Sequence, residues 1–125
     1  MARKPSPTLT EAELEIMEAL WRLGPSPARA LLPALPRPKA YNTVLTLLAI
    51  LEKKGYVRRE RQGRTHIFHP TVDRPTACRQ ALRHLLARFF HGSPALLVAT
   101  LLSDRELGPE VRQLLRELAP PKEEG

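Results

Sequence analysis

The chain has 125 residues, and 20 Lys and Arg side chains against 13 Asp and Glu give it a formal net charge of +7. A chain of this length holds one domain, or a small domain with an appendage, which excludes a large enzyme. The charge is uneven, because residues 1–77 carry 13 basic and seven acidic groups and residues 78–125 carry seven and six. This asymmetry indicates that the N-terminal part meets a polyanion.

Cysteine content and hydropathy indicate where the protein resides. Cys78 is the only cysteine, so the chain cannot form an internal disulfide or a cysteine metal cluster. No stretch approaches the roughly 18 apolar residues of a membrane span, and the N-terminus lacks the apolar segment of a signal peptide. We therefore expect a cytoplasmic protein with no membrane partner and no cofactor. Residues 1–8 and 120–125 are predicted to be disordered tails.

The first two helices are predicted from start and stop signals. In "LTEAELEIMEALWRLG", Thr10 precedes Glu13 at the spacing of a capping box, and Leu9 and Leu14 are placed as a hydrophobic staple. Gly24 and the following Pro end this helix. In "SPARALLPAL", Ser26 is expected to cap a short second helix with Pro27 as its first residue, ending near Leu35.

A third helix is expected from Lys39 or Ala40 to Lys54, with Gly55 as its C-terminal stop. Its apolar residues recur at the spacing of one buried face, at Val44, Leu47, Leu48 and Leu51. The opposite stripe is small and polar and contains no acid; it comprises Asn42, Thr46, Ala49 and Lys53, bordered by Thr43. Such a stripe suits a helix that lies against base edges in a major groove about 12 Å wide.

After Gly55 the period changes from 3.6 to 2, which predicts a hairpin. The strands are expected over Tyr56–Arg61 and Thr65–His69, joined through Gln62 and Gly63. Six cations fall in twelve residues against one acid, Glu60; they are Lys53, Lys54, Arg58, Arg59, Arg61 and Arg64. A basic hairpin beside such a helix is the layout of a winged helix, in which the helix enters the major groove and the hairpin rests on the sugar-phosphate backbone.

The C-terminal helices are too apolar to be covered within 48 residues. "TACRQALRHLLARFFHG", "SPALLVATLL" and "ELGPEVRQLLREL" each place apolar residues at helical spacing. Ser93 before Pro94, and Ser103 three residues before Glu106, are the expected helix starts. Because a core of this size rarely stands alone, pairing with a second copy is expected. The predicted dimerisation residues are Leu82, Leu85, Phe89, Phe90, Leu97, Leu101, Leu114, Leu115 and Leu118.

The run "NTVLTLLAILEKKGYVRRERQGRTHIFHP" resembles the penicillinase-repressor family of winged-helix transcriptional regulators. The matching positions are Thr43, Val44, Thr46, Leu48, Leu51, Lys54, Gly55, Gly63, Arg64, Phe68 and Pro70. "LTEAELEIMEALWRLGP", with its Leu20–Trp21 pair, is similar to that family's first helix, and the resemblance covers roughly residues 9–118. It implies a repressor that binds operator DNA as a homodimer through its C-terminal region.

The fold class predicted is mainly α with a small β-wing. A winged helix-turn-helix DNA-binding domain is expected over residues 9–74 and a helical dimerisation region over 75–119. The expected function is that of a homodimeric repressor on a palindromic operator in double-stranded DNA. The candidate DNA-binding residues are Lys39, Tyr41, Asn42, Thr43, Thr46, Lys53, Arg61 and Arg64.

Departures from the family pattern leave the operator and the inducing signal open. Relatives commonly place a long polar residue where this chain has Leu45 and often a basic one where it has Ile50. The tail "APPKEEG" lacks the cysteines of copper-responsive relatives. Antibiotic-responsive relatives are inactivated by proteolysis near the positions of Thr100 and Leu101, so an unidentified sensor or protease is a further partner that the resemblance suggests.

Other function classes have less support in the sequence. His66 and His69, three apart on a strand, point to opposite faces and do not make a metal site. Cys78 is expected to be a small buried hydrophobe, and no nucleophile is arranged with a base. A protein-interaction module with a basic wing, and a DNA binder with little sequence preference, remain the alternatives.

Overall fold

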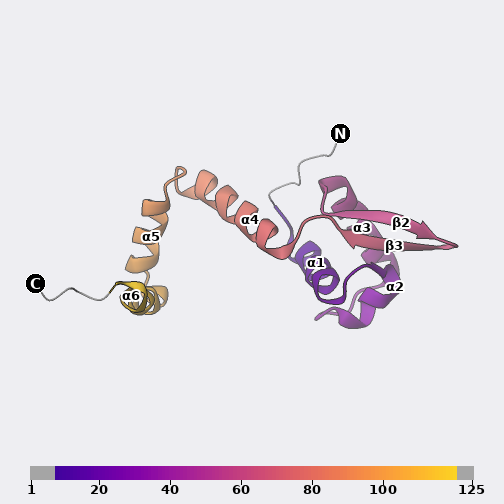
Figure 1. Cartoon of the computed structure of the whole chain (residues 1–125), viewed down its shortest axis with the longest axis horizontal. Coiled ribbons are helices and arrows are strands. Elements are labelled where there is room, and N and C mark those ends of the chain that lie inside the picture. Colours follow the sequence, from indigo (N-terminus) through magenta and orange to yellow (C-terminus); the bar gives the residue numbers. More distant parts are fainter. Residues whose placement is uncertain (1–7, 121–125) are drawn as a thin grey trace, which may run out of the picture. The chain divides into compact units, whose positions relative to one another are not determined.

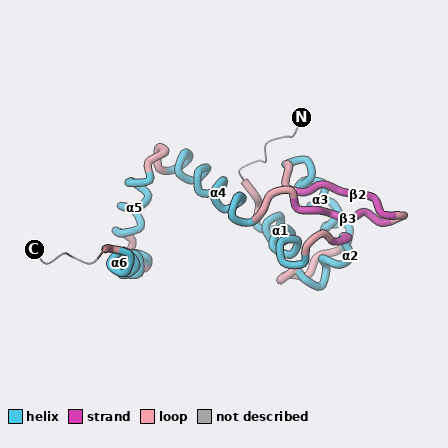
Figure 2. The backbone as a smooth tube through the Cα atoms, viewed as in Figure 1, coloured by secondary structure: helices cyan, strands magenta, loops and turns pink. Residues whose placement is uncertain are grey.

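The computed structural model describes residues 8–120, and the chain forms two compact units, Met1–Leu82 and Arg83–Gly125. Of the predicted tails over residues 1–8 and 120–125, all but Thr8 and Pro120 lie outside the described residues. Figure 1 shows the elements along the chain, and Figure 2 separates helices from strands. They are α1 (Glu11–Leu23), β1 (Ser26–Pro27), α2 (Ala28–Leu31), the 3-10 turn η1 (Leu32–Ala34), α3 (Tyr41–Lys54), β2 (Val57–Gln62), β3 (Thr65–Pro70), α4 (Arg74–Phe89), α5 (Pro94–Ser103) and α6 (Leu107–Leu118).

Helix α1 begins at the predicted capping box. The Glu13 amide donates to Thr10 Oγ1 at 3.1 Å, and the Thr10 amide donates to Glu13 Oε1 at 2.7 Å. Two amides that a helix start leaves unpaired are thereby satisfied. The helix ends where Gly24 adopts a φ of 84° and donates its amide to the Leu20 carbonyl.

The predicted second helix is wrong at its start. Ser26 does not cap it; its hydroxyl donates to the Gly24 carbonyl at 2.8 Å, and Ser26 pairs with Phe68 in a short antiparallel strand. Helix α2 therefore begins at Ala28, and a 3-10 turn replaces its continuation. The turn contains Pro33, which has no amide hydrogen to donate to the preceding turn of an α-helix.

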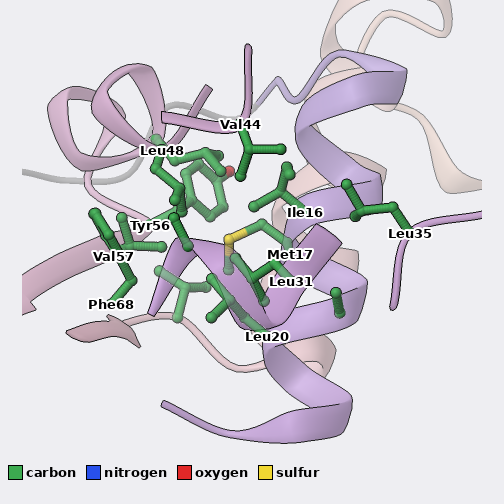
Figure 3. Packing of buried hydrophobic residues seen from close by; sticks show 14 of the residues in the cluster. Ile16, Met17, Leu20, Leu31, Leu35, Val44, Leu48, Tyr56, Val57 and Phe68 are labelled. Atoms are coloured by element: carbon green, nitrogen blue, oxygen red, sulfur yellow. The ribbon is translucent and has the colours of Figure 1, made fainter. Parts of the chain in front are cut away.

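The core of the first unit is built mainly by α1, α3 and the base of the hairpin (Figure 3). On α3, Val44, Leu48 and Leu51 are fully buried, as their spacing predicts, whereas Leu47 is only partly buried. Gly55 ends the helix in the left-handed conformation, with a φ of 92°. The largest side chains packed around these residues are Ile16, Met17, Leu20, Leu31, Tyr56 and Phe68.

The hairpin forms one strand pair of a three-stranded antiparallel sheet with strand order β1-β3-β2. The predicted loop is displaced by one residue, because Gln62 pairs with Thr65 and the two loop residues are Gly63 and Arg64. Gly63 has a φ of 62°. Two-residue hairpin loops require a positive φ, and glycine accepts it without steric cost, which fixes the position of the loop.

The first turns of α4 belong to the first unit. The Trp21 indole donates to the Val72 carbonyl at 2.8 Å, the guanidinium of Arg74 lies 3.1 Å from the Glu18 carboxylate, and Ala77 is buried in the core. The division between the two units therefore falls inside α4, rather than at the start of the helix.

The second unit contains α5 and α6, which pack against each other. Ser93 caps α5 by accepting from the Leu96 amide, as predicted, but Ser103 does not cap α6. Its hydroxyl donates to the Thr100 carbonyl, and Asp104 Oδ1 instead accepts from the Glu106 and Leu107 amides, at 2.9 Å each. Asp104 therefore takes the place at the start of α6 that the sequence assigned to Ser103.

A partly buried ion pair joins the start of α1 to the end of α3. Lys54 Nζ lies 2.7 Å from Glu13 Oε1, and the Glu13 residue is only 1% exposed. Burial raises the pKa of this carboxyl, but the hydrogen bonds from Lys54 and Thr10 outweigh burial and leave the pKa below its ordinary value of 4.5. The pair therefore stabilises the fold in its ionised form.

We expect Glu13→Gln to lower the free energy of unfolding by about 2 kcal/mol at pH 7. Gln can keep the capping-box bond to Thr10, while the Lys54 ammonium loses its counter-ion. Because the pKa of Glu13 is lowered by folding, the pair contributes fully above pH 4.5, and its contribution is lost as the pH falls through the folded-state pKa. Urea unfolding at pH 7 and pH 3, followed by Trp21 fluorescence, measures both effects.

The matched control is Glu11→Gln, because Glu11 lies in the same first turn with its side chain 81% exposed. This variant should change stability little. Equal losses for the two variants at pH 7, or a loss for Glu13→Gln that persists undiminished at pH 3, would contradict the assigned role of the ion pair.

Candidate nucleic-acid interface

Helix α3 presents its predicted polar stripe to solvent. Asn42, Thr46, Ala49 and Lys53 are all exposed, and so is Thr43 beside them. The Thr46 hydroxyl donates to the Asn42 carbonyl at 3.0 Å, so its oxygen stays available as an acceptor. Asn42, Thr43 and Thr46, at the N-terminal end of the stripe, have short side chains. The helix backbone can therefore come close to the edge of a base.

The two residues that depart from the family pattern have different environments. Leu45 is half-buried and packs against the core, so it does not project freely beside Thr46. Ile50 is 39% exposed. Of the two, only Ile50 gives α3 a largely exposed aliphatic surface.

The two candidate residues around the start of α3 are held by neighbours. The Lys39 side chain is only 12% exposed, and its Nζ lies 3.6 Å from a Glu15 carboxylate oxygen. The Tyr41 ring is half-buried, and the Arg29 guanidinium lies 4.4 Å from its centroid. Lys39 is therefore a predicted DNA contact that the structure holds beside an acid.

The cations of the hairpin divide between its two faces. Cross-strand pairing sets Arg59 opposite Phe68 and Arg61 opposite His66, and strand alternation puts these four on the face that packs on the core at its base. The other face carries Arg58, Glu60 and His69. Its charge is partly neutralised, because Glu60 Oε2 lies 3.4 Å from Arg58 Nη1 and 3.0 Å from His69 Nε2.

The candidate residues Arg61 and Arg64 lie at the tip of the hairpin. Arg61 Nε donates to the Gly63 carbonyl at 2.9 Å, which braces the loop, and Arg64 is an exposed loop residue. Arg59, by contrast, is held nearer the base by Glu52, with its Nη2 3.2 Å from a carboxylate oxygen.

A cleft of about 400 Å³ separates the hairpin from α2 and the start of α3. Sequence reasoning did not identify it, because the lining residues come from distant parts of the chain. Three of the lining residues are arginines and none is acidic; the lining comprises Pro27, Ala28, Arg29, Tyr41, Leu45, Arg59, Arg64, Thr65, His66 and Phe68. The only sequence signal that could have suggested it is the isolated cation Arg29 on the short helix before α3.

The predicted dimerisation residues lie on α4, the loop that follows it, α5 and α6. Phe90, Leu97 and Leu101 are half-buried. The others are exposed: Leu82 45%, Leu85 40%, Phe89 67%, Leu114 51%, Leu115 46% and Leu118 71%. Among the described residues from 83 to 120, only Gly108 is buried.

Cys78 is exposed, so the expectation of a buried thiol was wrong. It lines a cavity together with Trp21 and Ala77. Residues 8–120 contain no group of three or more His, Cys, Asp or Glu that could hold a metal ion. In the same range no single helix is long and apolar enough to cross a membrane, and only α4 and α5, taken together across the bend between them, reach that length and composition.

The family model described as "Penicillinase repressor" matches residues 9–120. The chain belongs to the penicillinase-repressor family. The penicillinase repressor of Bacillus licheniformis is 26% identical over 118 residues, which cover 92% of each chain. An uncharacterized 16.5 kDa protein from the ptsI 3′ region of Latilactobacillus sakei is 27% identical over 113 residues, covering 86% of this chain and 77% of that protein.

Membership of this family agrees with the fold and gives the general activity. The family is one of DNA-binding transcriptional repressors with a winged helix, and the helices and small antiparallel sheet described above are consistent with that fold. The predictions of the family and of the fold class are thereby confirmed.

Proposed function

We propose that the protein is a homodimeric repressor that binds a palindromic operator, with α3 in the major groove and the hairpin on the sugar-phosphate backbone. The observation that carries this proposal is the exposed, acid-free stripe of α3 beside a hairpin whose core-side face is cationic. In this arrangement Thr43 and Thr46 would reach base edges, and Asn42 would supply an amide that can pair with adenine. Arg61 and Arg64, at the tip of the hairpin, would contact phosphates.

The composition of the second unit supports dimerisation. A pair of short helices with Gly108 as its only buried residue among residues 83–120 leaves its apolar side chains in water. Large apolar side chains left exposed in this number favour an interface. A second copy supplies the same surface, and a two-fold dimer would set two α3 helices on half-sites about 10 base pairs apart, or a multiple of that.

The alternative of a protein-interaction module has weaker support from α3. Interaction surfaces are anchored by aromatic or long apolar side chains. The one aromatic residue of α3, Tyr41, is half-buried beneath Arg29, and Ile50 is the largest apolar side chain of the helix that is exposed. A sensor or protease partner stays a proposal from the family; Thr100 and Leu101 lie inside α5, so cleavage there would require local unfolding of that helix.

The experiment that tests this function is selection from a random duplex pool at about 0.15 M salt, since affinity for DNA depends on salt concentration. We expect the retained duplexes to share a dyad. Retention without a shared motif would instead establish a binder with little sequence preference, and absence of retention would favour the protein-interaction module.

We expect Thr46→Ala to reduce the difference in binding free energy between the selected dyad and its single-base variants by about 1 kcal/mol, which is roughly fivefold in relative affinity. Thr46→Val removes the hydroxyl and keeps the branched shape, whereas Thr46→Ser keeps the hydroxyl and removes the methyl group. Comparing their dissociation constants by fluorescence anisotropy assigns the effect to a hydrogen bond or to contact with a thymine methyl. An unchanged ranking of duplexes in all three variants would remove Thr46 from the base-reading residues.

We expect Leu114→Asp to yield monomers that bind the dyad poorly, because it places a charge in the apolar stripe of α6. Light scattering should give the 14.1 kDa mass of one chain. Gln113→Asp is the matched control, since Gln113 is exposed and bonds to Glu117 on the polar side of the same helix. A Leu114→Asp variant that remains dimeric would show that α6 does not form the interface.

A further inference from the structure

The cleft between the hairpin and α2 holds two arginines that are oriented by aromatic rings. The Arg29 guanidinium lies 4.4 Å from the Tyr41 centroid, and that of Arg59 lies 5.1 Å from the Phe68 centroid. Glu52 fixes Arg59 further with two contacts of 3.2 Å. A guanidinium held over a ring has lost part of its rotamer freedom before any ligand arrives, which lowers the entropic cost of binding.

The cleft also carries positive charge that nearby acids do not balance. None of its ten lining residues is acidic. Glu52 faces Arg59 from outside the lining, whereas Arg29 and Arg64 have no acidic partner within 4.0 Å among residues 8–120. His66 and Thr65 add side chains that can donate hydrogen bonds. Planar cations that converge without an acid are the donor set for a phosphate oxygen pair.

We propose that this cleft binds one phosphate group of the DNA backbone in each half-site, with Arg29 as a direct contact and Tyr41 as the residue that positions it. This inference rests on the proposed function. The cleft is bounded by the first turns of α3 on one side and by the core-side face of the hairpin on the other. If α3 contacts the bases of a DNA strand and the hairpin contacts its backbone, that DNA strand passes between the two elements. A phosphate group at this point would be contacted from both sides.

The three arginines of the cleft would have different roles. Arg29 belongs to neither α3 nor the hairpin, yet the cleft brings it beside Arg64. Arg59 also lines the cleft, and its pairing with Glu52 offsets its charge while holding its guanidinium in place. Loss of charge at Arg29 should therefore affect DNA binding even though that residue lies outside the helix and hairpin that sequence patterns identify.

The first test compares salt dependence on one fixed duplex, which requires no knowledge of the operator. Arg29→Gln should weaken binding about tenfold at low salt and reduce the magnitude of the slope of log affinity against log salt by about 1. Arg29→Lys should keep the slope, because the charge remains, while losing part of the affinity with the planar fork. The matched control is Arg22→Gln, since Arg22 is an exposed arginine of α1 that does not line the cleft.

Thermal unfolding shows whether Arg29 contacts DNA or only supports the fold. If Arg29 contacts DNA, Arg29→Gln and Arg22→Gln should unfold at similar temperatures. Equal salt slopes for these two variants would overturn the cleft proposal while leaving the repressor function untouched. A different outcome is that the wild type selects no dyad, while Arg29→Gln still reduces the slope of log affinity against log salt. That result would overturn the proposed operator recognition and would support the phosphate site.

The second test locates the phosphate and distinguishes DNA from a free anion. In the selected duplex, phosphates are replaced one at a time by neutral methylphosphonates. At one position per half-site, the replacement should weaken DNA binding by the wild type and leave DNA binding by Arg29→Gln unchanged. Inorganic phosphate is also titrated against the free protein while the His66 ring signals are followed by NMR. Saturable binding of phosphate that leaves DNA affinity unchanged would show that the cleft serves a free anion and would overturn the proposal.

Discussion

The packing of α3 against α1 determines how the DNA-facing side of the first unit would be presented. Val44, Leu48 and Leu51 are buried against a face of α1 that includes Ile16 and Leu20, and a helix with one buried stripe has its opposite stripe fixed in water. The rotation of α3 is thus set by hydrophobic burial, and the polar residues that would meet DNA are presented as a consequence. The ion pair between α1 and the end of α3 reinforces this packing at the N-terminus of α1.

The basic surfaces of the first unit differ in whether acidic side chains lie beside their cations. The hairpin is rich in cations, yet Glu60 offsets charge on one face and Glu52 on the other. Among residues 8–120, no acidic side chain pairs with Arg64 at the tip or with Arg29 in the cleft. Because charge–charge attraction to a polyanion acts over about 8–10 Å at physiological salt, the location of the unbalanced cations matters more than their number.

The two units differ in how complete they are as folded bodies. The first buries a continuous core from helices and hairpin, whereas among residues 83–120 of the second only Gly108 is buried. A Cβ at Gly108 would lie 2.5 Å from the Leu102 carbonyl, so α5 and α6 approach closely there and still leave their apolar stripes uncovered. Dimerisation would therefore complete the fold of this unit as well as place two DNA-binding units on one operator.

The sequence by itself determined the elements whose signals are local. The capping box at Thr10, the buried stripe of α3 and the stop at Gly55 depend on residues within a few positions of one another, and so does the run of motifs that indicates the family. Only the tertiary structure decided that Ser26 joins a sheet instead of capping a helix, because its strand partner Phe68 lies 42 positions further along the chain. The cleft has the same origin: which cations converge, and which are balanced by acids, depends on distances across the fold that no local pattern contains.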